Sequence, residues 1–155
     1  MRGISRRGFM KTAGQGIAAS AALMAFARPG KAAPSERVRH AVIGVGGQGR
    51  YHAKLFDSFE DCEVVAICDV DPEQRKKTLA ELPEPGRVGE IADFRRIIGD
   101  PEIDTVSVAT PDHWHTSVAL AAMLAGKHVY VEKPCCHNVH EGAVLDRAAK
   151  KLGRC

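Results

Sequence analysis

The chain has 155 residues, of which 45% are hydrophobic and 26% are charged, as in an ordinary globular domain. Its net charge of +3 arises at one end: residues 1–40 hold eight of the 22 basic residues and only Glu36 of the 19 acidic ones, which leaves 14 basic and 18 acidic residues after position 40. A mildly acidic body excludes an extended basic surface for nucleic acid, and no apolar run approaches the roughly 20 residues of a membrane span.

The first residues predict an export signal. Arg6 and Arg7 precede Phe9 and Lys11, and a weakly hydrophobic stretch at 12–27 leads to small residues that suit cleavage. This order of charged, apolar and small-residue regions is typical of the twin-arginine route, whereas the alternative is a basic amphipathic first helix. We therefore expect residues 1–35 to be a twin-arginine signal and the protein to be periplasmic or otherwise exported by that route.

Short apolar runs alternate with helical stretches in the predicted domain at 36–155. Strands are expected at 39–45, 63–68, 88–91, 104–109 and 128–131, and helices at 47–59, 72–82, 93–98, 111–124 and 138–152. The continuous apolar run at 63–68 indicates a strand that is covered on both faces. Parallel strands with right-handed crossovers predict the α/β fold class, with a Rossmann-like doubly wound parallel sheet.

A glycine-rich segment follows the first predicted strand and opens the first helix. Gly44, Gly46 and Gly49 form the GxGxxG pattern. Gly44 suits the tight turn, Gly46 lets a pyrophosphate approach the backbone, and Gly49 lets the helix pack closely on the strand. The free N–H groups of the helix N-terminus also favour phosphate. A set of five residues is therefore expected to bind a dinucleotide: Gly44, Gly46, Gly47, Gln48 and Gly49.

An acidic residue completes this fingerprint at the end of the second strand. Asp69 lies 20 positions after Gly49, where a carboxylate accepts hydrogen bonds from the ribose hydroxyls. Since a carboxylate repels a 2′-phosphate, NAD is favoured over NADP. Asp71 is close enough to share this role, and the alternative is a glycine-rich turn beside a solvated acid.

Two further motifs lie where the fourth and fifth predicted strands end: ATPDHWH at 109–115 and AGKHVYVEKP at 125–134. In an open parallel sheet the ligand lies beyond the carboxyl ends of the strands, so both motifs are expected to face the cofactor. His113 and His115 could suggest a metal pair. No carboxylate or cysteine completes a ligand set there, so no metal site is expected.

The segments GVGGQG, CDVD, ATPDHWH and AGKHVYVEKP, in this order, resemble the Gfo/Idh/MocA oxidoreductase family over about residues 37–152. The family is named for glucose-fructose oxidoreductase and inositol dehydrogenase, among others. The resemblance implies that Lys133 is the catalytic-site lysine, which hydrogen-bonds the substrate hydroxyl and assists its deprotonation as hydride leaves for NAD. It also implies a set of residues beside the cofactor: Thr110, Pro111, His115, Glu132, Lys133 and Pro134.

What the resemblance implies about function is an NAD-dependent oxidoreductase that acts on a sugar, a polyol or a related cyclic alcohol. One alternative is an NAD-dependent glycosidase that works by transient oxidation, and another is a non-catalytic dinucleotide-binding module. The resemblance further implies a large second domain with the substrate pocket and most dimer contacts, which does not occur before Cys155. We therefore expect a truncated chain whose sheet is incomplete at its C-terminus, with little activity alone, and a full-length protein that is a homo-oligomer.

Overall fold

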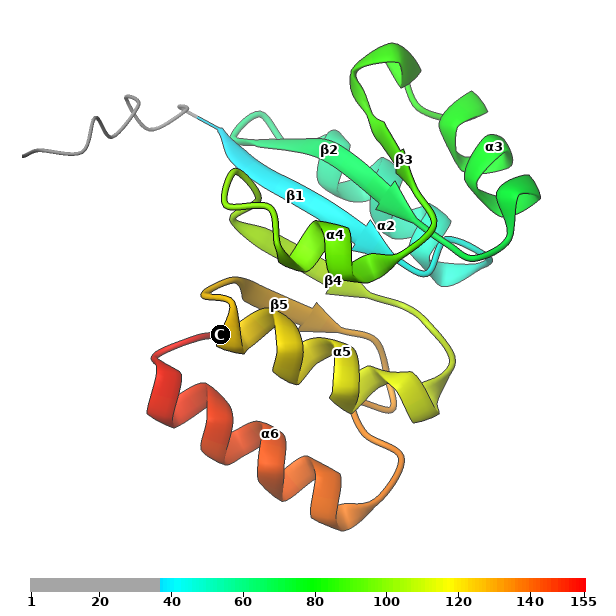
Figure 1. The fold of residues 1–155 in the computed structure, drawn as a ribbon. Helices are drawn as coiled ribbons and strands as arrows, with labels where there is room; N and C mark the ends of the chain where they lie inside the picture. The colour runs from blue at the N-terminus through cyan, green and yellow to red at the C-terminus, as the bar shows by residue number, and fades with distance from the viewer. Residues whose placement is uncertain (1–36) are drawn as a thin grey trace, which may run out of the picture. The chain divides into compact units, whose positions relative to one another are not determined.

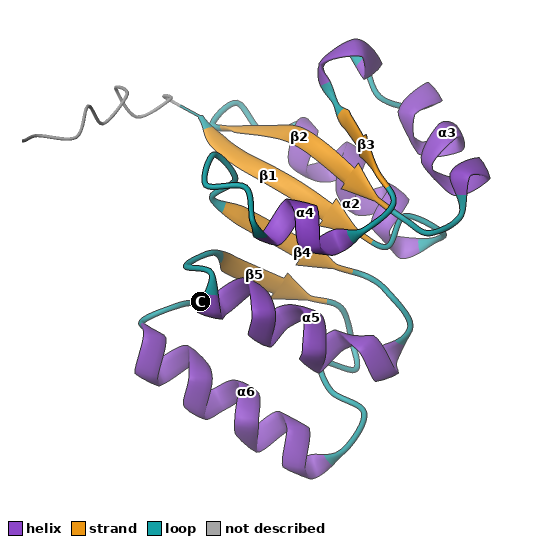
Figure 2. Ribbon diagram, in the orientation of Figure 1, coloured by secondary structure: helices purple, strands orange, loops and turns teal. Residues whose placement is uncertain are grey.

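The computed structural model describes residues 37–155, which form a five-stranded parallel sheet with helices on both faces (Figures 1 and 2). The strands lie in the order β3-β2-β1-β4-β5. Their bounds are β1 (Val38–Ile43), β2 (Cys62–Cys68), β3 (Gly89–Ile91), β4 (Thr105–Val108) and β5 (His128–Val131). The helices are α2 (Gln48–Asp57), α3 (Pro72–Ala80), η1 (Pro85–Arg87), α4 (Phe94–Ile98), α5 (Asp112–Leu124) and α6 (Val139–Leu152).

This arrangement confirms the predicted Rossmann-like fold class, because the order 3-2-1-4-5 is that of a doubly wound sheet. Each predicted strand and helix is present, with bounds that differ by only one or two residues at most ends. The first strand ends at Ile43 rather than at Val45, since Gly44 turns the chain with a φ of +87°. The predicted signal at 1–35 lies outside the described residues.

Two apolar layers hold the sheet between its helices. Ile43, Val106 and Val108 point to the layer beneath α4 and α5, whereas Val42 and Ile67 point to the layer that α2 and α3 cover. In Figure 1, α2 lies behind the sheet and α4 and α5 lie in front of it. Burial on both faces is the reason that the strand segments read as continuous apolar runs.

Side chains cap the beginnings of two helices. Asp71 caps α3 and Asn138 caps α6, where the Asn138 side-chain oxygen accepts from the Glu141 N–H at 3.0 Å. The Asn138 side-chain amide also donates to the Glu141 carboxylate at 3.0 Å. Gly126 follows α5 with a φ of +87°. Among residues 37–155, no helix is both long and apolar enough to cross a membrane.

The second apolar layer gives a direct test of the packing. Ile67, on β2, is fully buried in this layer. Ile67→Ala is expected to lower the free energy of unfolding by about 2–5 kcal/mol, because it removes buried methylenes and leaves a cavity. Urea denaturation measures this loss. The control Val70→Ala, at a side chain that is 85% exposed, is expected to change it by less than about 0.5 kcal/mol, and an equal loss in both variants would contradict this account.

Candidate functional site

A cavity of about 870 Å³ opens at the carboxyl ends of β1, β2 and β4. This is the edge of a doubly wound sheet at which ligands bind, between strands on either side of the point where the strand order reverses. The volume falls within the range of small-molecule and cofactor sites. Gly44, Gly46, Gly47, Gln48, Asp69, Thr110 and Pro111 are the predicted residues that line it.

The glycine-rich turn forms the floor of this cavity. At Gly49 a β-carbon would lie 1.7 Å from the Gly44 carbonyl oxygen, so only glycine lets α2 begin this close to β1. At Gly44 a β-carbon would lie 2.6 Å from the backbone nitrogen of Thr110, which brings the β1 turn against the β4 turn. Gly46 instead faces open space, since its β-carbon would meet nothing closer than 4.0 Å.

Asp69 stands at the end of β2 and faces the glycine turn. One of its carboxylate oxygens accepts from the backbone N–H of Val45 at 2.9 Å, and the other accepts from the N–H of Asp71 at 3.0 Å. These bonds fix the carboxylate at the cavity wall, where each oxygen keeps a lone pair for a further donor. Asp71 also lines the cavity, but its side chain caps α3 through the N–H of Glu73.

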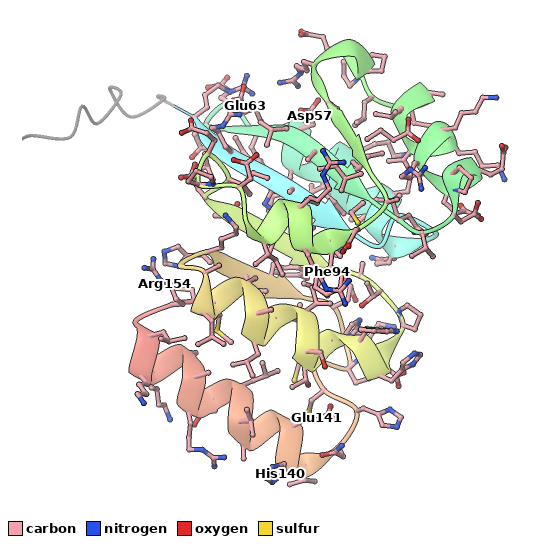
Figure 3. All side chains as sticks on the ribbon, in the orientation of Figure 1. Asp57, Glu63, Phe94, His140, Glu141 and Arg154 are labelled. Carbon is pink, nitrogen blue, oxygen red and sulfur yellow. The ribbon has the colours of Figure 1, made fainter. Side chains whose placement is uncertain are left out.

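An aromatic and cationic wall lies opposite the glycine turn. Phe94, which is labelled in Figure 3, begins α4, and Trp114 lies in the first turn of α5. Their rings meet edge to face, with centroids 6.4 Å apart. The Arg95 guanidinium lies 5.2 Å from the centre of the Phe94 ring. All three residues line the cavity, and Trp114 is 46% exposed. This wall offers flat apolar surfaces to a ligand, and its guanidinium is ion-paired with Asp93, which also lines the cavity.

The EKP segment follows β5 and stands beside the cavity rather than in its wall. Lys133 is exposed, and its peptide bond to Pro134 is cis. The ring of His115 bridges the two strand ends, because Nδ1 lies 2.7 Å from the Pro134 carbonyl oxygen and Nε2 lies 2.7 Å from that of Thr110. A carbonyl oxygen only accepts, so a ring nitrogen donates to its oxygen where it carries the proton.

Glu132 turns away from the cavity into the protein. One carboxylate oxygen lies 2.9 Å from Nε2 of His52 on α2, and the other accepts from the backbone N–H of Lys133 at 3.0 Å. The Lys133 N–H and the His52 ring hold the pKa of Glu132 below its usual value, although burial acts in the opposite direction. Glu132 therefore binds the protein's own groups in this structure.

Gly49, which was predicted to bind the cofactor, does not line the cavity and instead packs α2 against the turn after β1. The structure separates the other predicted site residues into two groups. One group lines the cavity, and the other, made up of Glu132, Lys133, Pro134 and His115, adjoins it at the end of β5 and the start of α5. Sequence reasoning missed Phe94 and Arg95 in the cavity wall and left His52 unassigned. Phe94 and Arg95 follow the carboxyl end of the third strand, and only this position in the sequence could have indicated that they line the cavity.

A dinucleotide fits these residues on structural grounds. Gly46 leaves room for a pyrophosphate against the backbone, and the N-terminus of α2 points its free N–H groups there. The Asp69 carboxylate stands where ribose hydroxyls would donate, and the aromatic wall offers a surface for a base. In the described part of the chain, no cluster of three or more His, Cys, Asp or Glu is arranged to hold a metal ion.

The fold and this cavity define a Rossmann domain of the dinucleotide-binding class. The model of the oxidoreductase family with an NAD-binding Rossmann fold, Gfo/Idh/MocA, matches residues 38–155. The chain belongs to this family.

Known relatives agree with this assignment. A glycosyl hydrolase family 109 protein of Shewanella pealeana is 33% identical over 98% of this chain and 38% of its own length. An NAD-binding oxidoreductase of Klebsiella pneumoniae is 30% identical, with a TM-score of 0.64 over 77% of this chain and 33% of its own. A biliverdin reductase of Synechocystis, solved with biliverdin and NADP+, is 28% identical, with a TM-score of 0.68 over 76% of this chain and 36% of its own. The chain spans about a third of the length of these relatives.

The open space at Gly46 yields a test of the cavity. Gly46→Ala is expected to lower the affinity for NAD by about tenfold or more, because its methyl group blocks the approach of the pyrophosphate to the backbone. Trp114 is the single tryptophan of the chain and lines the cavity, so NAD titration can be followed by its fluorescence.

The same titration includes a matched glycine variant. Gly86→Ala also places a methyl group in open space, but Gly86 lies outside the cavity wall, and its variant is expected to bind as the unaltered chain does. Unchanged affinity in Gly46→Ala, with its fold intact by circular dichroism, would contradict the assignment of the cavity.

Proposed function

We propose that this chain is the nucleotide-binding part of an NAD-dependent oxidoreductase that acts on a sugar, a polyol or a related cyclic alcohol. The observation that carries the proposal is the placement of Lys133 just after β5. This strand pairs with β4, and the turn that follows β4 lines the cavity. An amine held there can exchange a proton with a substrate hydroxyl beside the cofactor. Membership of an oxidoreductase family supports the reaction class.

The roles of the residues follow from their positions. The α2 N-terminus and the glycine turn would bind the pyrophosphate, and Asp69 would orient a ribose. When bound, NAD supplies the hydride acceptor. Lys133 would hold the substrate hydroxyl and take up its proton through Nζ, because its exposed side chain is free to reach beyond the sheet. Thr110 and Pro111, at the cavity wall, would flank the reacting face.

Lys133→Ala is expected to lower the rate of substrate oxidation by about 10²- to 10⁴-fold, the usual contribution of a general acid or base, while NAD affinity stays within about threefold. The measurement is absorbance of NADH at 340 nm, with the protein in its native length and a panel of sugars, polyols and cyclic alcohols. Lys76→Ala, on α3, is the matched control. An unchanged rate in Lys133→Ala would contradict the role of this lysine.

A second candidate function is an NAD-dependent glycosidase that works by transient oxidation. The glycosyl hydrolase family 109 relative, which matches nearly the whole chain, favours it. The same residues would serve, because a lysine that takes a proton from a hydroxyl also serves a transient oxidation. Release of the aglycone from a glycoside without net formation of NADH supports this candidate, whereas net NADH from a free polyol supports the first. A protein that binds NAD and does neither is the third candidate, a non-catalytic binding module.

The proposed cofactor is NAD rather than NADP. The carboxylate of Asp69 repels a 2′-phosphate, whereas Arg95, which also lines the cavity and is ion-paired with Asp93, would attract one. We give more weight to Asp69, because two backbone N–H groups fix its position at the glycine turn. Fluorescence titration is expected to show binding to NAD that is tighter by about tenfold or more. Equal or tighter binding of NADP would contradict this choice.

The proposal includes export and self-association of the whole protein. Arg6 and Arg7, with Phe9 and Lys11, support the twin-arginine route, which carries folded proteins and would deliver the cofactor already bound. A protein found only in the cytoplasmic fraction would contradict export. A homo-oligomer is proposed from the family resemblance alone, and a monomer in analytical ultracentrifugation of the native-length protein would contradict it.

A further inference from the structure

The carboxylate of Glu132 connects α2, the helix whose N-terminus faces the cavity, to the backbone of Lys133 after β5. One oxygen lies 2.9 Å from Nε2 of His52, two turns or less into α2, and the other accepts from the N–H of Lys133 at 3.0 Å. The two residues of the pair stand 80 positions apart in the sequence. Because a carboxylate only accepts, the ring proton of His52 lies on Nε2 and points at Glu132.

The surroundings of His52 leave its ring with Glu132 as its hydrogen-bond partner among the described residues. The residue is 3% exposed, and its ring meets the rings of Tyr130 and Phe56 edge to face, with centroids 5.3 and 6.3 Å apart. Its Nδ1 atom has no hydrogen-bond partner in the described residues. The single polar contact of the ring is therefore the one to Glu132, which is itself 9% exposed.

The backbone around Lys133 is held on both sides, although its side chain is exposed. The Glu132 carboxylate accepts from the backbone N–H of Lys133 itself. On the other side, Nδ1 of His115 on α5 lies at hydrogen-bond distance from the carbonyl oxygen of the next residue, Pro134. A backbone fixed at these two points leaves Lys133 only its own side-chain torsions. These torsions then turn about a backbone position that is fixed beside the end of β5.

We propose that His52 and Glu132 are positioning residues, which hold the backbone of Lys133 so that its amine meets the nicotinamide end of the cofactor site. The inference rests on the proposed function, since it gives Lys133 its role at that site. A buried polar pair is a poor source of stability compared with apolar packing, because its desolvation costs offset its attraction. A directional role explains why such a pair stands at this point in the structure.

The test measures the exposure of the Lys133 amine directly and needs no substrate. Trace acetylation of the full chain, with and without saturating NAD, gives the reactivity of each lysine by peptide mass spectrometry. In the unaltered chain, NAD is expected to slow acetylation of Lys133 by about fivefold or more, the effect of one well-made contact. Lys150, which is exposed on α6, is the internal control and is expected to show no change.

Two variants at one position separate the hydrogen bond from the packing of the ring. His52→Leu replaces the donor ring with an apolar side chain of similar size, and it is expected to abolish the protection of Lys133. His52→Gln keeps an N–H donor near the place of Nε2 and is expected to retain protection. Trp114 fluorescence is expected to give an NAD affinity within about threefold of the unaltered chain in both.

The outcomes distinguish this inference from the proposed function. No protection of Lys133 in the unaltered chain, with NAD bound, would contradict the proposed function itself. Protection in the unaltered chain that persists in His52→Leu would overturn the positioning role alone, as would equal loss in His52→Leu and His52→Gln. If His52→Leu does not fold, Glu132→Gln replaces it. This variant is expected to lose the protection of Lys133, because a neutral amide makes weaker hydrogen bonds than a carboxylate. Full protection of Lys133 in Glu132→Gln would overturn the positioning role.

Discussion

The close approach of α2 to the ends of β1 and β4 is the constraint on which the site depends. No side chain larger than hydrogen fits at Gly49, where a β-carbon would stand 1.7 Å from the carbonyl oxygen of Gly44. Gly44 in turn lies against the backbone of Ala109 and Thr110. These contacts bring three chain segments together at the point where the strand order reverses, and they aim the N-terminus of α2 into the cavity.

The second part of the site depends on polar groups that span the sheet. The bond from His52 to Glu132 runs from α2 to the end of β5, and the bonds of His115 run from α5 to the turns after β4 and β5. The helix that would bind the pyrophosphate therefore also supports the segment that carries the lysine. Under the proposed function, the cofactor and Lys133 would share one rigid frame, which suits a reaction that needs both in fixed relation.

Sequence patterns predicted the features that depend on near neighbours in the chain. The glycine spacing and the acid at the end of the second strand indicated the cavity floor, because each residue there answers a local steric or electrostatic demand. The pairing of His52 with Glu132 was not predictable in this way. It depends on how α2 is rotated against the end of β5, which lies two places from β1 in the sheet. The wall formed by Phe94 and Arg95 was also missed, because α4 has only five residues and no strong pattern.

Family membership places this domain among oxidoreductases, and relatives that are named for different functions share about a third of their length with it. What they share is the cofactor-binding frame, so its geometry is the central claim. A crystal structure of the chain with NAD tests it most directly. The account predicts the pyrophosphate on the N–H groups after Gly46, a ribose on Asp69 and the nicotinamide within reach of Nζ of Lys133. NAD bound with its nicotinamide turned away from Lys133, or outside this cavity, would contradict it.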